Sequence, residues 1–293
     1  MTEKSRGWIP RELGPGNYGS PGNVKIRWWN YIEYVQPHFD MQTEIINNLR
    51  FMGKLTGNED LLDVGCSDGS FLVDLRYLYQ HHDGLTGLEP HLEQLEGDLD
   101  TDLSFVEELN NMEDIDIVKG VVQSMPFADN TFDGVFARRM MYEVPEYEQR
   151  QAMLEIKRVS KEKGFFVLTT SGYFNKPEHR KFEDRIAHFL GITSPPLMNA
   201  SYTAQRAAIE LPKWFNHIEP IWQDGTMVFK STEEAEDYYL SIVTMQDQFN
   251  PIPNIGALRQ AIDMVVRKEV EESIALTGDF RDPIELAGFI CWD

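Results

Sequence analysis

Hydrophobic and polar positions change their spacing along the chain, and each change predicts a new element of structure. Leu61, Leu62 and Val64 form a short apolar run that ends at a glycine, which is typical of a buried strand. Between 70 and 79 the apolar side chains recur every three or four positions, which is typical of a helix that packs on one face. Four more short apolar runs predict strands, at 84–90, 114–120, 131–139 and 164–172.

A helix is predicted between the last two of these strands, over 146–164. It begins with acidic residues and ends with Lys161, Lys163 and Gly164, which suits the dipole of a helix. Strands that alternate with helices imply βαβ units, and therefore a mostly parallel sheet with helices on both faces. The pattern thus predicts an α/β fold.

The alternation stops after Gly172. Residues 173–214 have a helical pattern with loops, broken by two adjacent prolines. The segment 217–229 predicts a strand pair or one long bulged strand. The remaining patterns predict two helices and a terminal strand, over 231–243, 257–274 and 285–293.

The N-terminal region has a different character. Its first 22 residues contain five glycines and three prolines, which favour an arm or lid over a helix. The pattern then becomes helical over 25–55, with one predicted face formed by Tyr31, Tyr34, His38 and Met41. Pro37 interrupts this face, which predicts two helices or a kink.

The net charge is −21, from 27 basic and 48 acidic residues, and it bears on the partners of the protein. An acidic surface repels phosphate backbones and anionic lipids, so general nucleic-acid binding is disfavoured. The segment 89–116 holds eleven acids and no lysine or arginine, which favours a solvated acidic surface insertion. Two cysteines are too few for a disulfide framework, and no run of about eighteen apolar residues exists, so we expect a cytoplasmic protein without a membrane span.

The strongest chemical signal is the string LLDVGCSDGSFL, in which a strand enters a glycine turn and a helix begins just beyond. Gly65 and Gly69 allow the backbone to approach a ligand closely, and the helix N-terminus adds partial positive charge. About twenty residues further on, Glu89 ends the next predicted strand, where an acid is able to hold both hydroxyls of a ribose. A glycine turn alone is often only a tight connection, but the turn together with this acid predicts a nucleotide site.

These motifs resemble those of class I S-adenosylmethionine (SAM)-dependent methyltransferases. LLDVGCSDG resembles the family's glycine motif, and GVVQSMPFADNTFDGVFARRMMYEV followed by GFFVLTT resembles the methyltransferase type 11 group, which includes the ubiquinone/menaquinone-biosynthesis-like enzymes. The motifs follow the family's order over roughly 58–171. The resemblance implies a Rossmann-like fold, with a seven-stranded mostly parallel sheet, an antiparallel last strand and a helical cap.

The resemblance implies two sets of contacts for the methionine end of SAM. Asp63, in the first strand, stands where the family's acid reaches the methionine ammonium, often through water. Gly65, Cys66, Ser67 and Gly69 stand in the turn around the methionine part.

For the nucleoside end, the resemblance assigns Glu89 to the ribose hydroxyls. Val122 and Gln123 stand in the loop that meets the adenine in the family. Ala137 and Arg138 follow the fourth strand, where backbone carbonyls face the reactive end of SAM in the family.

The chain departs from the family pattern at three places. Ser67 stands where the family commonly has glycine, and a serine fits there without strain if its φ is negative. Val121 replaces an acid that often contacts adenine, which leaves that contact to backbone groups or to Gln123. Tyr142 and Glu143 replace a Glu-His pair after the fourth strand.

The division of the chain follows from these motifs. We expect a flexible arm or lid at 1–23, an N-terminal helical cap at 24–55 and a SAM-binding core at 56–172. A helical cap insertion is expected at 173–214, and the sheet is completed by strands with a helical insertion at 215–293.

The acceptor site is less specified. Trp28, Tyr31, Tyr34 and His38 fit an acceptor pocket or simple packing of the helix equally well, because amphipathic spacing serves both. Arg139 and its neighbour Arg138 suit a carboxylate or phosphate of the acceptor, or an ion pair with Glu143 or another nearby acid. Candidates for a general base, where the acceptor needs one, are His38, Tyr142, Glu143 and His179. The histidine spacings predict no metal site.

The sequence therefore predicts a SAM-dependent methyltransferase that acts on oxygen or nitrogen of a small-molecule acceptor and yields S-adenosylhomocysteine. Two alternatives remain. One is methylation of protein or nucleic acid, and the other is a SAM-binding protein without transferase activity.

Overall fold

The computed structural model describes residues 33–67, 69–81, 84–90, 115–194, 200–243 and 260–293. The chain forms two compact units. The larger unit comprises Val35–Glu178, Pro196–Met227 and Asp282–Asp293, and the smaller one comprises Met1–Tyr34, His179–Pro195 and Val228–Arg281. The predicted arm at 1–23, and nearly all of the acidic segment, lie outside the described residues.

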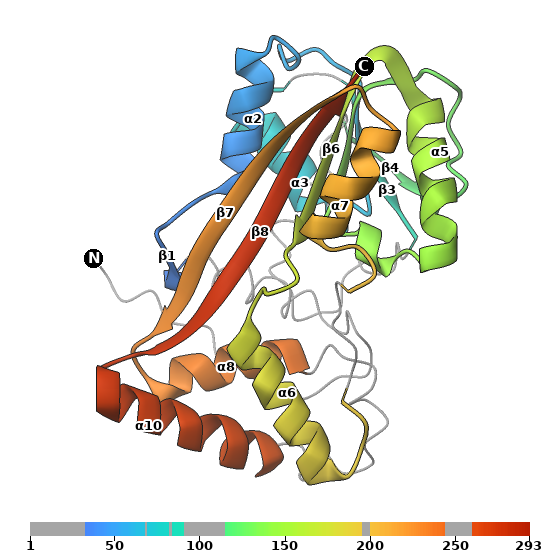
Figure 1. The fold of residues 1–293 in the computed structure, drawn as a ribbon. Helices are drawn as coiled ribbons and strands as arrows, with labels where there is room; N and C mark the ends of the chain where they lie inside the picture. The colour runs from blue at the N-terminus through green and yellow to red at the C-terminus, as the bar shows by residue number, and fades with distance from the viewer. Residues whose placement is uncertain (1–32, 68, 82–83, 91–114, 195–199, 244–259) are drawn as a thin grey trace. The chain divides into compact units, whose positions relative to one another are not determined.

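One mixed sheet of eight strands organises the larger unit, in the order β1-β7-β8-β6-β5-β2-β3-β4. The strands are β1 (Val35–Gln36), β2 (Leu61–Val64), β3 (Leu85–Glu89), β4 (Ile115–Lys119), β5 (Phe132–Arg138), β6 (Ser160–Ser171), β7 (His217–Phe229) and β8 (Phe280–Trp292). Strands β2 to β6 pair in parallel, whereas β8 is antiparallel to β6 (Figure 1). This confirms the predicted Rossmann-like sheet and its antiparallel last strand, with the two-residue β1 as an addition.

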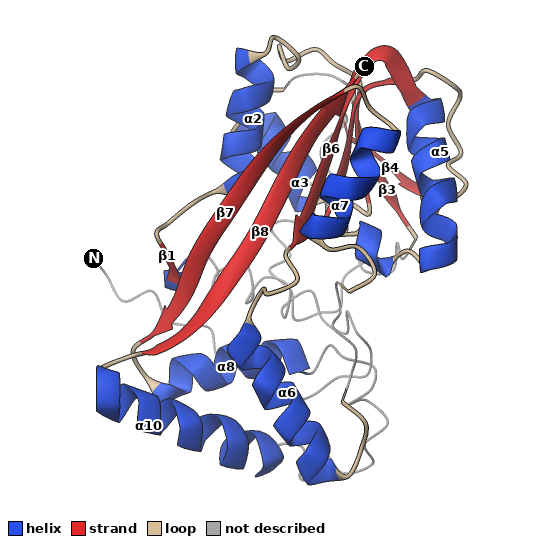
Figure 2. Ribbon diagram, in the orientation of Figure 1, coloured by secondary structure: helices blue, strands red, loops and turns tan. Residues whose placement is uncertain are grey.

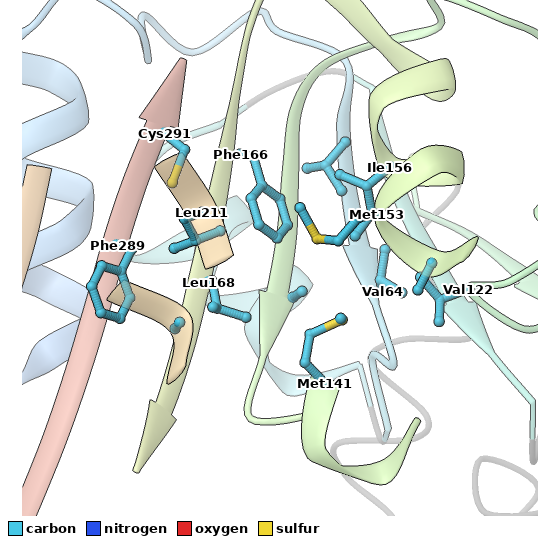
Figure 3. Close-up of a cluster of buried hydrophobic side chains, with 14 of the residues drawn as sticks. Val64, Val122, Met141, Met153, Ile156, Phe166, Leu168, Leu211, Phe289 and Cys291 are labelled. Carbon is cyan, nitrogen blue, oxygen red and sulfur yellow. The ribbon is translucent and has the colours of Figure 1, made fainter. Parts of the chain in front are cut away.

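Helices cover both faces of this sheet, because both faces of its central strands are apolar (Figure 2). Helices α2 (Met41–Phe51) and α3 (Ser70–Tyr77) pack on one face, through Ile46, Leu49 and Leu72 among others. Helices α5 (Gln149–Val159) and α7 (Ala204–Glu210) pack on the other face, followed by the 3-10 helix Leu211–Lys213. Figure 3 shows the second core, where Met153 and Ile156 of α5 lie beside Phe166 and Val64 of the strands.

The smaller unit is mostly helical, with α6 (Pro177–Leu190), α8 (Thr232–Val243), a π-helix at Asp263–Arg267 and α10 (Lys268–Thr277). Its core contains an aromatic cluster of Phe182, Phe229, Tyr238, Tyr239 and Phe280. The start of α8 is a capping box: the Glu234 amide donates to Ser231 Oγ at 3.2 Å, and the Ser231 amide donates to Glu234 Oε2 at 3.1 Å. The helix start predicted there is therefore confirmed.

The single helical face predicted through Tyr31, Tyr34, His38 and Met41 is wrong, whereas the break predicted at Pro37 is confirmed: Glu33 and Tyr34 are helical, and the next helix starts beyond the proline. Val35 and Gln36 form β1, with Val35 opposite Met227 of β7, and α2 begins only at Met41. The ring of Pro37 disfavours helical geometry at the residue before it. The helix restarts where the Asp40 carboxylate accepts hydrogen bonds from the amides of the first turn.

The helix predicted over 146–164 also ends early. It is preceded by the 3-10 helix Glu146–Glu148, and α5 stops at Val159, where β6 begins. Lys161 lies in this strand, with its ammonium 2.8 Å from a carboxylate oxygen of Asp60 and 2.7 Å from one of Asp133. These tertiary ion pairs are not visible in a local pattern, and they raise the pKa of Lys161.

The packing of α5 generates a stability prediction. Ile156 is fully buried, whereas Leu154 on the same helix is 38% exposed. Ile156→Ala should lower the free energy of unfolding by about 2–5 kcal/mol, since it leaves a cavity between helix and sheet. Leu154→Ala is the matched control and should cost less than about 1 kcal/mol. Denaturant unfolding measures both, and equal losses would contradict the observed orientation of α5.

Candidate functional site

The turn after β2 is shaped by three residues in the left-handed region of backbone conformation. The φ angles are 69° for Gly65, 53° for Ser67 and 76° for Gly69. The amides of Gly65 and Cys66 both donate to the carbonyl of Leu88, at 2.7 and 3.2 Å, so the turn is fixed to the neighbouring strand β3. The N-cap of α3 is Gly69, whose amide donates to the Cys66 carbonyl at 2.9 Å.

Glu89 meets this turn at the end of β3. The residue is only 5% exposed, and its carboxylate Oε2 accepts a hydrogen bond from the Ser67 amide at 2.9 Å. The contact follows from the register of the two parallel strands, in which Val64 stands opposite Leu88. The acid and the glycine turn singled out in the sequence therefore form one unit at the carboxyl edge of the sheet.

Ser67 does not meet the condition under which serine fits this turn without strain. Its φ is positive, and a side chain in that region costs roughly 1–2 kcal/mol because Cβ crowds the backbone. The conformation persists because the amide of Ser67 points at the buried carboxylate of Glu89. Glycine would adopt the same conformation without this cost.

Arg138 and Asp63 form an ion pair at the end of β5 and β2. The guanidinium Nη2 lies 3.4 Å from Asp63 Oδ2, and Nε lies 3.5 Å from Oδ1. The guanidinium also stacks on Phe71, with its carbon 3.7 Å from the ring centroid. An ion pair was one of the two interpretations of Arg138 and Arg139, and Arg138 forms one. The acid in this pair is Asp63.

Three more predicted cofactor contacts lie in β5 and in the loop after β4. They are Ala137, Val122 and Gln123. Ala137 is fully buried in β5, opposite Val64 of β2. Val122 is buried in the core shown in Figure 3, whereas the side-chain Nε2 of Gln123 donates to Glu148 Oε2 at 2.5 Å. Their contacts with adenine or with the reactive end of SAM stay predictions.

The candidates for acceptor binding and catalysis are more dispersed. His38 is exposed ahead of α2. Tyr142 and Glu143 lie in a 3-10 helix (Met141–Glu143) just after β5, with Tyr142 partly buried against the core and Glu143 exposed. Arg139, also exposed, has a φ of 55° and donates its amide to the Thr169 carbonyl.

Two candidates belong to the smaller unit. His179 of α6 is buried, stacks on Tyr239 and has Nε2 3.1 Å from Glu183 Oε1. Tyr34 lies with its ring centroid 4.9 Å from that of Phe229. The other two aromatic candidates, Trp28 and Tyr31, lie outside the described residues.

Sequence reasoning missed the link from α2 to this edge. Gln42 accepts from Arg138 Nη1 at 3.0 Å and donates to Asp74 Oδ2 of α3 at 2.9 Å. No local pattern marks Gln42, because its partners are far away in the sequence. Among the residues that the structure describes, no group of three or more His, Cys, Asp or Glu side chains is arranged to hold a metal ion. The helices described there also include none with the length and apolarity needed to cross a membrane.

Comparison with known proteins bears on this geometry. Residues 62–168 match the family described as methyltransferase domain, a range that begins within β2, includes the glycine turn and Glu89, and ends within β6. No curated protein sequence matches the chain significantly.

The fold is shared with many solved structures, and two of them serve as examples. YcgJ protein from Bacillus subtilis superposes with a TM-score of 0.52 at 14% identity, over 86% of this chain and 99% of its own. BH2331 from Bacillus halodurans, described as a candidate methyltransferase, has a TM-score of 0.51 at 16% identity, over 84% of this chain and 97% of its own. The family match confirms the predicted group for this part of the chain and, with it, a SAM-dependent methyltransferase as the enzyme class.

The strained turn generates a prediction about stability. Ser67→Gly should raise the free energy of unfolding by up to about 1 kcal/mol, because glycine removes the cost of a positive φ. Ser70→Gly, in the first position of α3, should have the opposite sign and cost about 0.5–1 kcal/mol. Thermal unfolding of the two variants decides the matter, and destabilisation by Ser67→Gly would mean that the serine side chain itself holds the turn.

Proposed function

We propose that the protein transfers the methyl group of SAM to an oxygen or nitrogen atom of a small-molecule acceptor. The observation that carries this proposal is the bond between the Ser67 amide and the buried carboxylate of Glu89. It fixes an acid at the end of β3 beside a glycine turn, which is the arrangement that holds a ribose in sheets of this kind.

The donors and acceptors at this edge fit the parts of SAM. The Glu89 carboxylate has the chemistry to accept from both ribose hydroxyls. The turn between Gly65 and Gly69 allows close backbone approach, and the N-terminus of α3 begins there. When bound, SAM supplies a methyl group that its positively charged sulfur already activates.

The main task of the protein residues is then to position the acceptor. Displacement at an activated methyl needs the acceptor atom in line and near, so positioning supplies most of the rate. A general base is required only if the acceptor keeps its proton at neutral pH. Tyr142 and Glu143 are the candidates that follow β5 directly, and they would take this role for an acceptor bound at the carboxyl edge.

The choice of a small acceptor is supported by charge. A net charge of −21 opposes the long-range attraction that nucleic-acid methylation relies on. A small molecule needs no extended basic surface, and the exposed Arg139 suits an acceptor that carries a carboxylate or phosphate.

Glu89 provides the first test of the cofactor site. Glu89→Gln keeps an oxygen that accepts from the Ser67 amide but loses the charge that strengthens bonds to two hydroxyls. SAM affinity, measured by titration calorimetry, should fall by about ten- to a hundredfold, which corresponds to roughly 1.5–3 kcal/mol. Glu162→Gln, at an exposed position of β6, is the charge-matched control and should leave affinity unchanged. Unchanged affinity in folded Glu89→Gln would remove this residue from the site.

The acceptor class is tested by transfer of a radiolabelled methyl group from SAM. The protein is incubated with three separated fractions of a cell extract: low-molecular-mass compounds, proteins and nucleic acids. We expect label to enter the low-molecular-mass fraction. Label confined to protein or nucleic acid would contradict the small acceptor, and binding of SAM with no transfer to any fraction would favour a SAM-binding protein without transferase activity.

A further inference from the structure

Arg138 is held by side chains from three different elements. Its guanidinium forms the ion pair with Asp63 of β2, stacks on Phe71 of α3 and donates to Gln42 of α2 at 3.0 Å. Gln42 is itself fixed by its bond to Asp74 at 2.9 Å. A long side chain that is fixed in this way has already lost its rotamer freedom, so it is preorganised for binding.

The two members of the ion pair differ in accessibility. The Asp63 side chain is 1% exposed, whereas that of Arg138 is 26% exposed. The carboxylate is therefore covered and already compensated, and of the two charged side chains that of Arg138 is the one that solvent or a ligand reaches. The guanidinium of Arg138 thus presents N–H donors at the carboxyl ends of β2 and β5, where Val64 and Ala137 stand opposite each other.

We propose that Arg138 binds the carboxylate of the methionine part of SAM and so makes the site selective for cofactors that carry this group. The proposal rests on the function proposed above. A guanidinium matches a carboxylate in planar geometry, and it has more N–H donors than its contacts to Asp63 and Gln42 use. Asp63 then acts as a positioning residue, since it holds the guanidinium and balances its charge.

The opposite arrangement is unfavourable on energetic grounds. If the ammonium of SAM replaced Arg138 on Asp63, the guanidinium would lose its buried carboxylate partner. Breaking such a pair is strongly destabilising. That arrangement makes a distinct prediction, because removal of the competing guanidinium would then tighten the binding of SAM.

Three ligands that differ in their amine and carboxylate groups test this proposal. S-adenosylhomocysteine carries the amine and the carboxylate, its decarboxylated analogue S-adenosyl-3-thiopropylamine carries only the amine, and 5′-methylthioadenosine carries neither. For the wild-type protein, titration calorimetry should show tighter binding of S-adenosylhomocysteine than of the decarboxylated analogue, by about ten- to a hundredfold. If none of the three binds, the proposed function itself fails.

Arg138→Met should remove this preference. Affinity for S-adenosylhomocysteine should fall about ten- to a hundredfold, to that of the decarboxylated analogue, while 5′-methylthioadenosine binds as before. In Arg138→Met the buried Asp63 carboxylate has lost its partner, which could unfold the protein. The double variant Asp63→Asn with Arg138→Gln avoids this unpaired charge and should show the same changes in affinity for the three ligands. Arg150→Met, at an exposed position of α5, is the charge-matched control and should keep the wild-type preference.

The remaining outcomes overturn the proposal. A preference for S-adenosylhomocysteine that persists in Arg138→Met and in the double variant would show that another group binds the carboxylate. Tighter binding of S-adenosylhomocysteine to Arg138→Met would show that the guanidinium competes with the ligand for Asp63. An equal loss for all three ligands in both variants would show a purely structural role.

Discussion

The hydrogen bond from the Ser67 amide to the buried Glu89 carboxylate is the contact on which the geometry of the site depends. It joins the turn after β2 to the end of β3, and the parallel register of these strands brings the two together. The turn adopts a positive φ at a serine to make this bond. The carboxylate of a residue that is only 5% exposed requires such compensation, so the strain and the acid belong to one arrangement.

Much of this edge was predictable because its signals are local. Apolar runs gave β2 and β3, the helical period gave α3, and the glycine turn between them gave the order strand, turn, helix. A right-handed crossover places consecutive parallel strands side by side, so an acid at the end of β3 had to lie near the turn. The antiparallel β8 came from the family resemblance, since an apolar run alone does not specify strand direction.

The parts that were missed depend on contacts between distant residues. Asp63 and Arg138 are separated by 75 positions, so their pairing follows from the register of β2 and β5 and not from either motif. The same holds for Lys161, whose tertiary carboxylate partners turn the predicted end of a helix into the start of β6. The short β1 likewise needs β7 as its partner, although Pro37 alone predicted an interruption of the helix.

The claim that the carboxyl edge of β2 and β3 holds the nucleoside of SAM is tested most directly by a crystal structure with S-adenosylhomocysteine. The account predicts both ribose hydroxyls within hydrogen-bond distance of the Glu89 carboxylate, and the amino-acid part over the turn between Gly65 and Gly69. A nucleoside bound elsewhere, with the Glu89 carboxylate out of reach of the ribose, would contradict it.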